Sequence, residues 1–190
     1  MPDVRLPHRF TGPLRTARLV LRAMTPADVE DVHAYQSRAE VCRYLPYEPR
    51  TRAEVAERVA RNAAALELAG DGDFWQLALE RADQPGRVIG DLYFSILSTE
   101  HATGEIGWVL HPEATGQGYV TEAARAVLDL AFGAMRLHRV RAQLDPRNET
   151  SIAVCRRLGM REEAHFVQDI WFRGAWADTG IYAILTGEWR

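Results

Sequence analysis

The chain has 190 residues, 47% hydrophobic and 26% charged, which fits one domain large enough to bury a core of its own. Its 23 basic residues, all of them Arg, nearly balance 26 acidic ones, and the formal net charge of -3 gives no reason to expect a nucleic-acid partner. The two cysteines lie far apart and the six histidines show no metal-binding spacing, so neither a disulfide framework nor a zinc site is indicated.

No stretch has the apolar length of a signal peptide or a membrane span. We therefore expect a cytoplasmic protein without a membrane partner. We expect residues 1–190 to form one domain, with residues 1–15 as a loose N-terminal extension.

The first regular element is a strand over residues 18–24, in which apolar side chains alternate with Arg and Val. A helix follows, with Thr25 as its N-cap and Pro26 in its first turn. After a loop rich in Pro and Tyr, residues 52–70 carry apolar side chains at helical spacing and end in Gly70, which predicts a helix of that length.

The second half of the chain begins with strand-like stretches separated by short turns, which predict an antiparallel meander. These strands are expected over residues 73–81, 87–97 and 104–111. The remaining elements are a helix over 119–134, a strand over 138–145, a helix over 148–159 and a hairpin-like pair of strands over 165–172 and 178–189. This order favours a mixed α/β arrangement of packed layers.

Two glycines, Gly116 and Gly118, lie directly before the helix predicted over 119–134. The start of a helix offers unpaired N–H groups and a partial positive charge, and glycine lets an anion approach the backbone, so the pair suits a pyrophosphate. A simple turn is the default interpretation of an isolated GxG. A Walker A motif is excluded because the chain has no Lys, and a Rossmann fingerprint is disfavoured because Thr121 stands where Gly or Ala is required.

Larger blocks of sequence carry a family resemblance. GEIGWVLHPEATGQGYVTEAARAVLDLAF, followed by HRVRAQLDPRNETSIAVCRRLGM and DTGIYAILTGEW, resembles the GNAT superfamily of N-acetyltransferases, in particular its RimJ/RimL-like branch. The opening TARLVLRAMTPADVEDV is similar to the usual start of that branch, so the resemblance covers nearly the whole chain.

The resemblance implies a single GNAT-type α/β (α+β) domain, with a mixed, mostly antiparallel central sheet and helices on both faces. It implies acetyl-CoA as the co-substrate and no metal. The acceptor would be a primary amine, either a protein N-terminus or a small molecule, which attacks directly in a ternary complex. Relatives in this branch are often homodimers.

The same resemblance assigns the binding of coenzyme A. The pyrophosphate would be held by backbone N–H groups in the glycine loop and the first turn of the helix, at Gln117, Gly118, Tyr119, Val120 and Thr121, and Gly116 would belong to the same cofactor-binding loop. A backbone N–H near Trp108, Val109 or Leu110 would bind the thioester oxygen, and Asn148 would contact the pantetheine arm. Glu113 departs from the family pattern, which has Gln or Arg at that position.

Two residues are candidates for proton transfer. Glu105 shares a strand face with Gly107, and a carboxylate pointing into the cleft could take the ammonium proton through a water; a solvated strand carboxylate is the equal alternative. Ser151 is implied to lie near the sulfur as a proton donor, although Asn148 and Ser151 would also serve as helix caps. Many relatives have a general-acid Tyr where this chain has Cys155, which we expect to be a small buried residue.

The acceptor side is expected to include loop and hairpin aromatics, because Tyr and Trp in loops often line binding sites. The candidates are Tyr44, Tyr47, Trp171 and Trp176. A non-catalytic acyl-CoA-binding module is the alternative function. The missing Tyr favours that alternative and Glu105 disfavours it.

Overall fold

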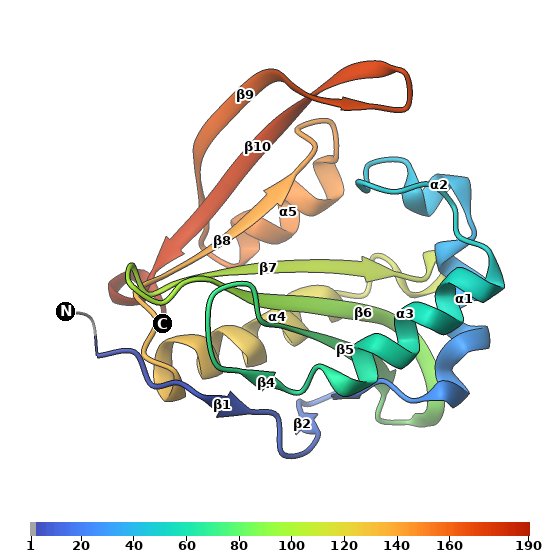
Figure 1. The fold of residues 1–190 in the computed structure, drawn as a ribbon, viewed down its shortest axis with the longest axis horizontal. Helices are drawn as coiled ribbons and strands as arrows, with labels where there is room; N and C mark the ends of the chain where they lie inside the picture. The colour runs from blue at the N-terminus through green and yellow to red at the C-terminus, as the bar shows by residue number, and fades with distance from the viewer. Residues whose placement is uncertain (1–2) are drawn as a thin grey trace.

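The computed structural model describes residues 3–190, and Figure 1 shows its strands and helices. The strands are β1 (His8–Arg9), β2 (Leu14–Arg15), β3 (Leu19–Ala23), β4 (Glu67–Leu68), β5 (Phe74–Arg81), β6 (Gln84–Ser98), β7 (Thr103–Leu110), β8 (Arg139–Leu144), β9 (Arg161–Phe172) and β10 (Ala175–Leu185). The α-helices are α1 (Val29–Gln36), α2 (Ala39–Cys42), α3 (Arg52–Ala64), α4 (Tyr119–Asp129) and α5 (Glu149–Arg157).

One sheet of eight strands organises the domain, in the order β2-β3-β5-β6-β7-β8-β10-β9. Neighbouring strands are antiparallel except β7 and β8, which are parallel. The strands β5, β6 and β7 form the predicted meander, and β9 and β10 form the predicted final hairpin. The mixed, mostly antiparallel sheet is therefore confirmed.

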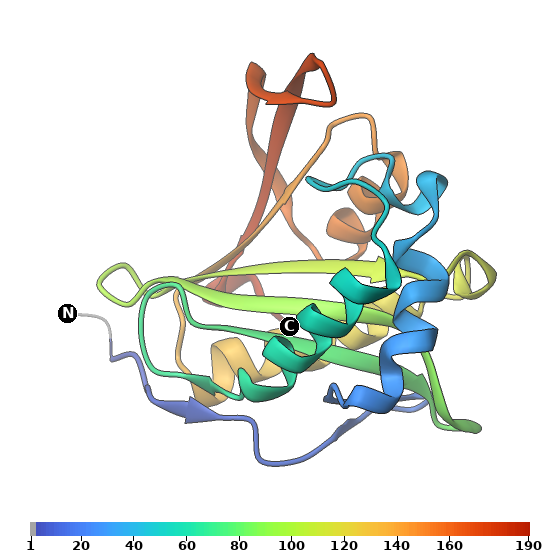
Figure 2. The same ribbon diagram turned by 45° about the vertical axis from the view of Figure 1, so that its right-hand side comes forward.

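Helices cover both faces of the sheet, as expected (Figures 1 and 2). On one face α4 packs its apolar side against the larger core, which includes Leu77, Leu79 and Leu92 from the strands. On the other face α1 and α3 pack over a smaller cluster that includes Ala78 and Val88. The split follows from strand geometry, because successive side chains point to opposite faces.

The parallel pairing of β7 with β8 is short. It joins Thr103 to Arg139, Gly104 to Val140 and Glu105 to Arg141, and beyond these positions the two strands diverge (Figure 1). The divergence leaves one edge of β7 without a neighbouring strand in the middle of the sheet.

Two sequence predictions are corrected. The helix expected over residues 52–70 ends at Ala64, and buried Leu68 belongs instead to β4, which pairs with β1. The segment from residue 8 to 15 is not loose, because β2 pairs with β3 and Phe10 packs edge to face on Trp75 with ring centroids 5.4 Å apart. Both errors come from pairings between distant segments, which local periodicity does not reveal. Residues 1–2 of the expected extension lie outside the described residues.

The helices around the predicted site have bounds close to those predicted from the sequence. The expected helix over 119–134 is α4 continued by a π-helical turn from Leu130 to Ala134. Helix α5 is capped by Asn148 and closed at Gly159, whose φ of +81° is the left-handed conformation that glycine favours. None of the helices within residues 3–190 combines the length and apolar character needed to cross a membrane.

Candidate active site

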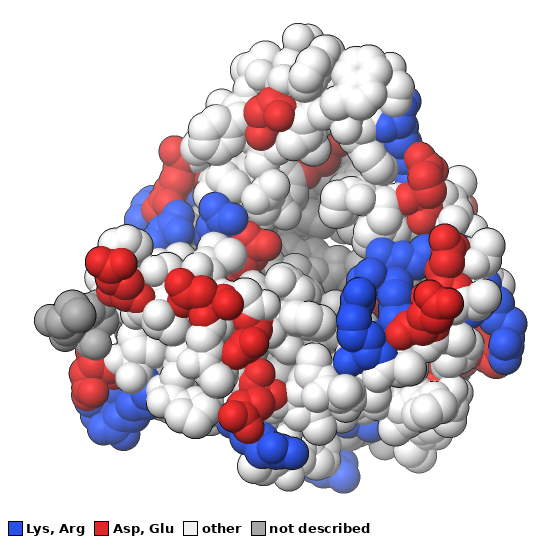
Figure 3. Space-filling view, in the orientation of Figure 1, with Lys and Arg blue, Asp and Glu red and all other residues white. Residues whose placement is uncertain are grey.

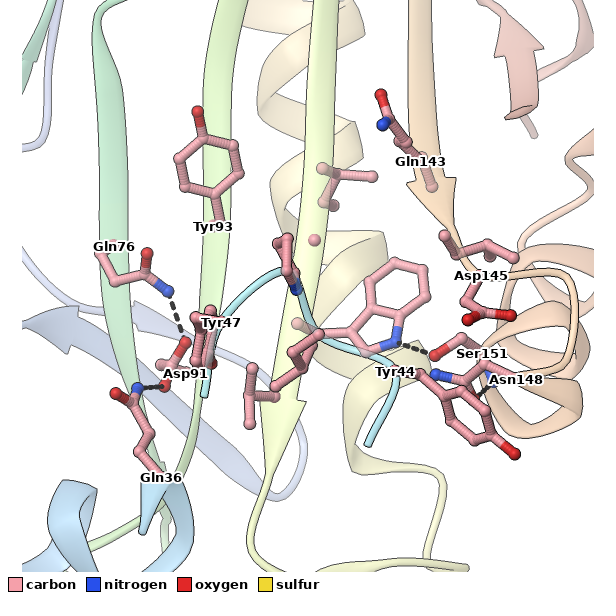
Figure 4. A pocket seen from close by; sticks show the side chains of 18 of the residues that line it. Gln36, Tyr44, Tyr47, Gln76, Asp91, Tyr93, Gln143, Asp145, Asn148 and Ser151 are labelled. Atoms are coloured by element: carbon pink, nitrogen blue, oxygen red, sulfur yellow. Dashed lines mark hydrogen bonds between the residues drawn. The ribbon is translucent and has the colours of Figure 1, made fainter. Parts of the chain in front are cut away.

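A cavity of about 600 Å³ opens where β7 and β8 diverge. Its walls come from α1, α3, the loop before α3, the strands β5 to β8, the start of α5 and the β9–β10 hairpin. Figure 4 shows lining side chains from α1, the loop before α3, the strands and the start of α5. The predicted site residues that line it are Tyr44, Tyr47, Glu105, Trp108, Val109, Asn148 and Ser151. The fold thus gathers expected acetyl-donor and acceptor residues around one space.

Trp171 and Trp176 do not line this cavity. They are 61% and 56% exposed near the turn of the β9–β10 hairpin, and their rings pack edge to face at 5.3 Å. Because side chains alternate along a strand, their neighbours Ile170, Phe172 and Ala177 face the cavity instead. The structure therefore gives no support to these two indoles as acceptor-binding residues.

The glycine loop has the geometry of an anion site at the start of α4. Gly116 and Gly118 have φ values of +76° and +78°, a conformation that side chains with a Cβ rarely adopt. The first helical hydrogen bond runs from the N–H of Glu122 to the carbonyl of Gly118 at 3.1 Å, so the N–H groups before it lack intrahelical acceptors. Within residues 3–190 the buried hydroxyl of Thr121 has no hydrogen-bond partner. These features fit the diphosphate of coenzyme A.

Arg18 holds this loop in place through hydrogen bonds, a role that the sequence did not indicate. Its backbone N–H and Nε donate to the carboxylate of Glu122 at 2.8 and 2.7 Å, and its Nη1 donates to the carbonyl of Gln117 at 3.0 Å. The hydroxyl of Thr16 donates to the same carboxylate at 2.5 Å. Burial alone would raise the pKa of Glu122, but the hydrogen bonds from Thr16 and Arg18 lower it, so the carboxylate stays charged.

Glu113 does not leave an uncompensated negative charge beside the loop. Its carboxylate forms an ion pair with Arg87 at 3.0 Å. The pair is solvent-exposed and therefore weak, but it places a guanidinium beside the one loop residue that departs from the family pattern.

Glu105 faces the cavity as expected, and it does so as one half of an ion pair. Its Oε2 accepts from Nε of Arg141 at 2.8 Å, across the last paired position of the parallel strands. Among residues 3–190 no protein group donates to Oε1. The pair orients the carboxylate at the point where β7 and β8 separate and leaves one oxygen available.

Asn148 and Ser151 combine capping with cavity lining. The side-chain oxygen of Asn148 accepts from the N–H of Ser151 at 3.1 Å, which caps α5. The hydroxyl oxygen of Ser151 accepts from Nε1 of Trp108 at 3.3 Å (Figure 4). Because that contact uses only the oxygen, the Ser151 hydroxyl can still donate its proton into the cavity.

Cys155 is fully buried and does not line the cavity. Burial raises the pKa of its thiol to about 12, so the thiol is protonated at neutral pH. A protonated thiol is a poor nucleophile. The expectation of a small buried residue is confirmed.

Asp91 lies in the cavity wall and was missed by the sequence analysis. It is 1% exposed, and its carboxylate accepts a hydrogen bond from the Tyr35 hydroxyl at 2.6 Å. It also accepts from Gln36 at 3.2 Å and from Gln76 (Figure 4). Burial raises the pKa of Asp91 despite these donors. Its register partner in β7 is Val109, so this buried network supports the strand that faces the cavity.

Comparison with known proteins decides the family. A model of the acetyltransferase (GNAT) domain matches residues 18–161. The chain belongs to the GNAT acetyltransferase family. This GNAT chain is 34% identical over 177 residues to the uncharacterized N-acetyltransferase YnaD of Bacillus subtilis, a match that covers 93% of this chain and 99% of YnaD.

Solved structures agree with this assignment. A GNAT-family acetyltransferase from Bacillus anthracis superposes with a TM-score of 0.82 at 32% identity, covering 93% of this chain and 99% of the other. Spermidine N-acetyltransferase from Vibrio cholerae, solved with CoA and spermine, shares the fold with a TM-score of 0.76 at 21% identity, covering 91% and 98% of the two chains. The protein is therefore an acetyltransferase enzyme, and the non-catalytic alternative is not retained.

Proposed function

We propose that this GNAT enzyme, acting as one domain over residues 1–190, transfers the acetyl group of acetyl-CoA to a primary amine by direct attack in a ternary complex. The observations that carry the proposal are the cavity at the divergence of β7 and β8, and the glycine loop with unpaired N–H groups at the start of α4, the helix that follows β7 in the chain. The CoA bound in the structurally similar Vibrio cholerae enzyme supports the same co-substrate here.

Coenzyme A would be held mainly by the backbone. The N–H groups from Gln117 to Thr121 would bind the diphosphate, with Arg18 keeping the loop in place. Asn148 would contact the pantetheine arm, and a backbone N–H between Trp108 and Leu110 would bind the thioester oxygen. The Leu110 side chain packs toward the larger core, so only its backbone is a candidate. When bound, acetyl-CoA supplies the activated acetyl group.

The acceptor amine must lose a proton before it attacks. A primary amine has a pKa near 10, so at neutral pH about one molecule in a thousand is free base. The free oxygen of Glu105 would accept that proton through a water, and Ser151 would donate one to the departing sulfur; the hydrogen bonds that orient both side chains support these roles. The carboxylate of Glu105 is kept in position by Arg141.

The acceptor would bind between the loop before α3 and the strands. Tyr44 and Tyr47 line the cavity there, and both phenols can donate hydrogen bonds at neutral pH; burial raises the pKa of Tyr47 further above its ordinary value. A cavity of about 600 Å³ is of a size that suits a small molecule or the first residues of a peptide. Either a protein N-terminus, as the RimJ/RimL-like motifs suggest, or a small-molecule amine is compatible with this space.

A homodimer and a cytoplasmic location are part of the proposal. The β9–β10 hairpin exposes large apolar side chains outside the cavity lining, which are Phe166, Val167, Trp171 and Trp176. Such a group of apolar residues is typical of a surface covered by a partner, and we assign a second copy of this chain to it. Sedimentation of the parent as a monomer at micromolar concentration would contradict this assignment.

The activity is tested by following thiol release from acetyl-CoA with a panel of small amines and N-terminal peptides. We expect release with at least one class of amine. CoA binding without thiol release from any acceptor would argue against the proposed transfer.

Glu105→Gln tests the proposed base. We expect a lower rate at neutral pH that partly recovers as the pH rises, because the amine then loses its proton without help. Arg141→Gln is the matched control, since it removes the partner and leaves the carboxylate. A Glu105→Gln profile parallel to that of the parent would assign Glu105 a structural role only.

A further inference from the structure

The cavity wall carries both basic and acidic side chains. Figure 3 shows a hollow at the centre of this face with basic side chains gathered on its right, where α3 lies in Figure 1. Arg43, Arg50 and Arg58 line the cavity. Whether this wall attracts a cation or an anion depends on which of the lining charges are already paired.

The acidic groups on the wall are already held by partners. The carboxylate of Glu105 pairs with Arg141 at 2.8 Å. The carboxylate of Asp145 pairs with Arg147 at 2.6 Å, and that of Asp178 is hydrogen-bonded to the ring of His165 at 2.7 Å and to the N–H of Gln168 at 2.9 Å. These pairings reduce the attraction of the wall for a polycation.

The remaining carboxylate in the wall belongs to Asp91, and the side-chain amide of Gln36 connects it to Arg50 by hydrogen bonds. Gln36 accepts from Nη1 of Arg50 at 2.5 Å and donates to Asp91 at 3.2 Å. Arg50 also stacks on Tyr47, with 3.4 Å from its guanidinium carbon to the ring centroid. Arg50 and Asp91 therefore form one fixed unit, and Arg50 is not a free cation.

Arg58 is different. Its guanidinium is half-buried in the cavity wall and makes no hydrogen bond or ion pair with any group in residues 3–190. Burial, with Arg50 and Arg61 nearby, lowers its pKa, which marks an unfavourable environment for a cation without a counter-ion. An arginine in this position gains most from a planar anion that its forked donors can hold.

Asn62 provides an independent second observation. It lies one helical turn beyond Arg58 on α3, lines the same cavity and is 5% exposed. Its side-chain oxygen has no hydrogen-bond partner among the described residues, and its nitrogen contacts only the sulfur of Met24 at 4.0 Å. Because a side-chain amide can rotate by 180°, Asn62 can offer a donor to an anion that Arg58 holds. A buried polar group without a partner is costly, so a ligand is expected there.

We propose that the acceptor amine carries a carboxylate, which binds Arg58 and Asn62 on α3 while its amino group lies at the acetyl-transfer end of the same cavity. This inference rests on the proposed function and specifies its substrate class. It favours an amino-acid-like acceptor over a polyamine such as the spermine bound by the Vibrio cholerae relative.

The test compares amines that differ only in the distal group. δ-Aminovalerate, δ-aminovaleramide and pentylamine have amino groups of similar basicity and a similar length, and shorter and longer homologues of the acid and the amide cover other spacings. We expect kcat/KM for the best acid to exceed that of its amide by about 10- to 100-fold, the range typical of a charged hydrogen bond. Spermidine is expected to be poorer than the best acid.

Variants on α3 locate the effect. Arg58→Gln should reduce kcat/KM for the acid by about tenfold or more and leave the amide within about twofold, and Arg58→Lys should restore part of the loss. Arg61→Gln is the matched control, because Arg61 is an exposed arginine of the same helix outside the cavity lining. It removes the same charge and should leave the acid-to-amide ratio unchanged.

The outcomes separate this inference from the proposed activity. Turnover of pentylamine and the amides at rates equal to those of the acids would overturn the carboxylate site and leave the transferase function intact. Absence of thiol release with every amine would count against the proposed function. The carboxylate site would then be tested by calorimetry of the CoA-bound protein, and equal affinity for the acid and its amide would overturn it. Equal loss of preference in Arg58→Gln and Arg61→Gln would also overturn it.

Discussion

Gly118 offers the sharpest test of where coenzyme A binds. Its φ of +78° makes any side chain unfavourable, and we expect Gly118→Ala to lower the free energy of unfolding by about 1 kcal/mol. The new Cβ would lie 3.7 Å from Nη2 of Arg18, an ordinary contact, so no clash adds to this cost. Gly118→Glu has the same backbone cost and adds one negative charge at the loop.

The added charge sets the expected difference between the two variants. At a separation of about 7 Å and an effective dielectric constant of about 20, two unit charges repel by about 2.4 kcal/mol. We therefore expect Gly118→Glu to bind CoA about 50-fold more weakly than Gly118→Ala, with some relief from Arg18. The difference should shrink as salt is added, because exposed charges are screened.

Isothermal titration calorimetry of both variants with CoA measures this difference, and thermal unfolding checks that both are folded. Gly118→Ala is the control that separates charge from backbone strain. Equal CoA affinity of the two variants at low salt would refute the placement of the diphosphate at this loop.

Other residues give independent predictions. Cys155→Ala should keep kcat within about twofold of the parent in the thiol-release assay, because a buried thiol with a pKa of about 12 outside the cavity has no catalytic role; a tenfold loss would contradict this. Asp28→Asn should lower the free energy of unfolding by about 3 kcal/mol at neutral pH, since buried Asp28 accepts two hydrogen bonds from Arg22 at 2.7 Å. Burial would raise the pKa of Asp28, but those bonds lower it below 3.8, so the stabilisation is present above that value and is lost as the pH falls through the folded pKa; urea curves of variant and parent should converge on acidification. Gly90→Ala would place a Cβ 2.4 Å from the carbonyl oxygen of Val109, so the strands must separate, and we expect at least about 2 kcal/mol of destabilisation in urea titrations.

Local signals in the sequence predicted elements that depend on neighbouring residues. The start and end of α5 follow from Asn148 as its cap and Gly159 behind it, and the start of α4 follows from the glycine doublet. These features act through backbone groups within a few residues. The true end of α3 was not predictable in this way, because Leu68 continues the apolar pattern while pairing with a strand far away in the sequence.

The candidate site shows the same division. Glu105 and Ser151 were accessible to sequence reasoning because family motifs include their strand and helix. The local sequence gives no functional signal for the other two residues: Asp91 lies in an expected strand, and Arg58 lies among the charged residues of an expected helix. Only the packing of α1 and α3 over the sheet makes them neighbours in one cavity, and no local pattern encodes that packing.

The carboxylate of Glu122 joins the first part of the chain to the coenzyme loop, since Thr16 and Arg18 both donate to it. Ordering the loop by a ligand and ordering the segment before β3 are therefore energetically linked, and each favours the other. A shortened chain beginning after Arg18 would lose part of its affinity for the acetyl donor even though no residue of the catalytic cavity had been removed.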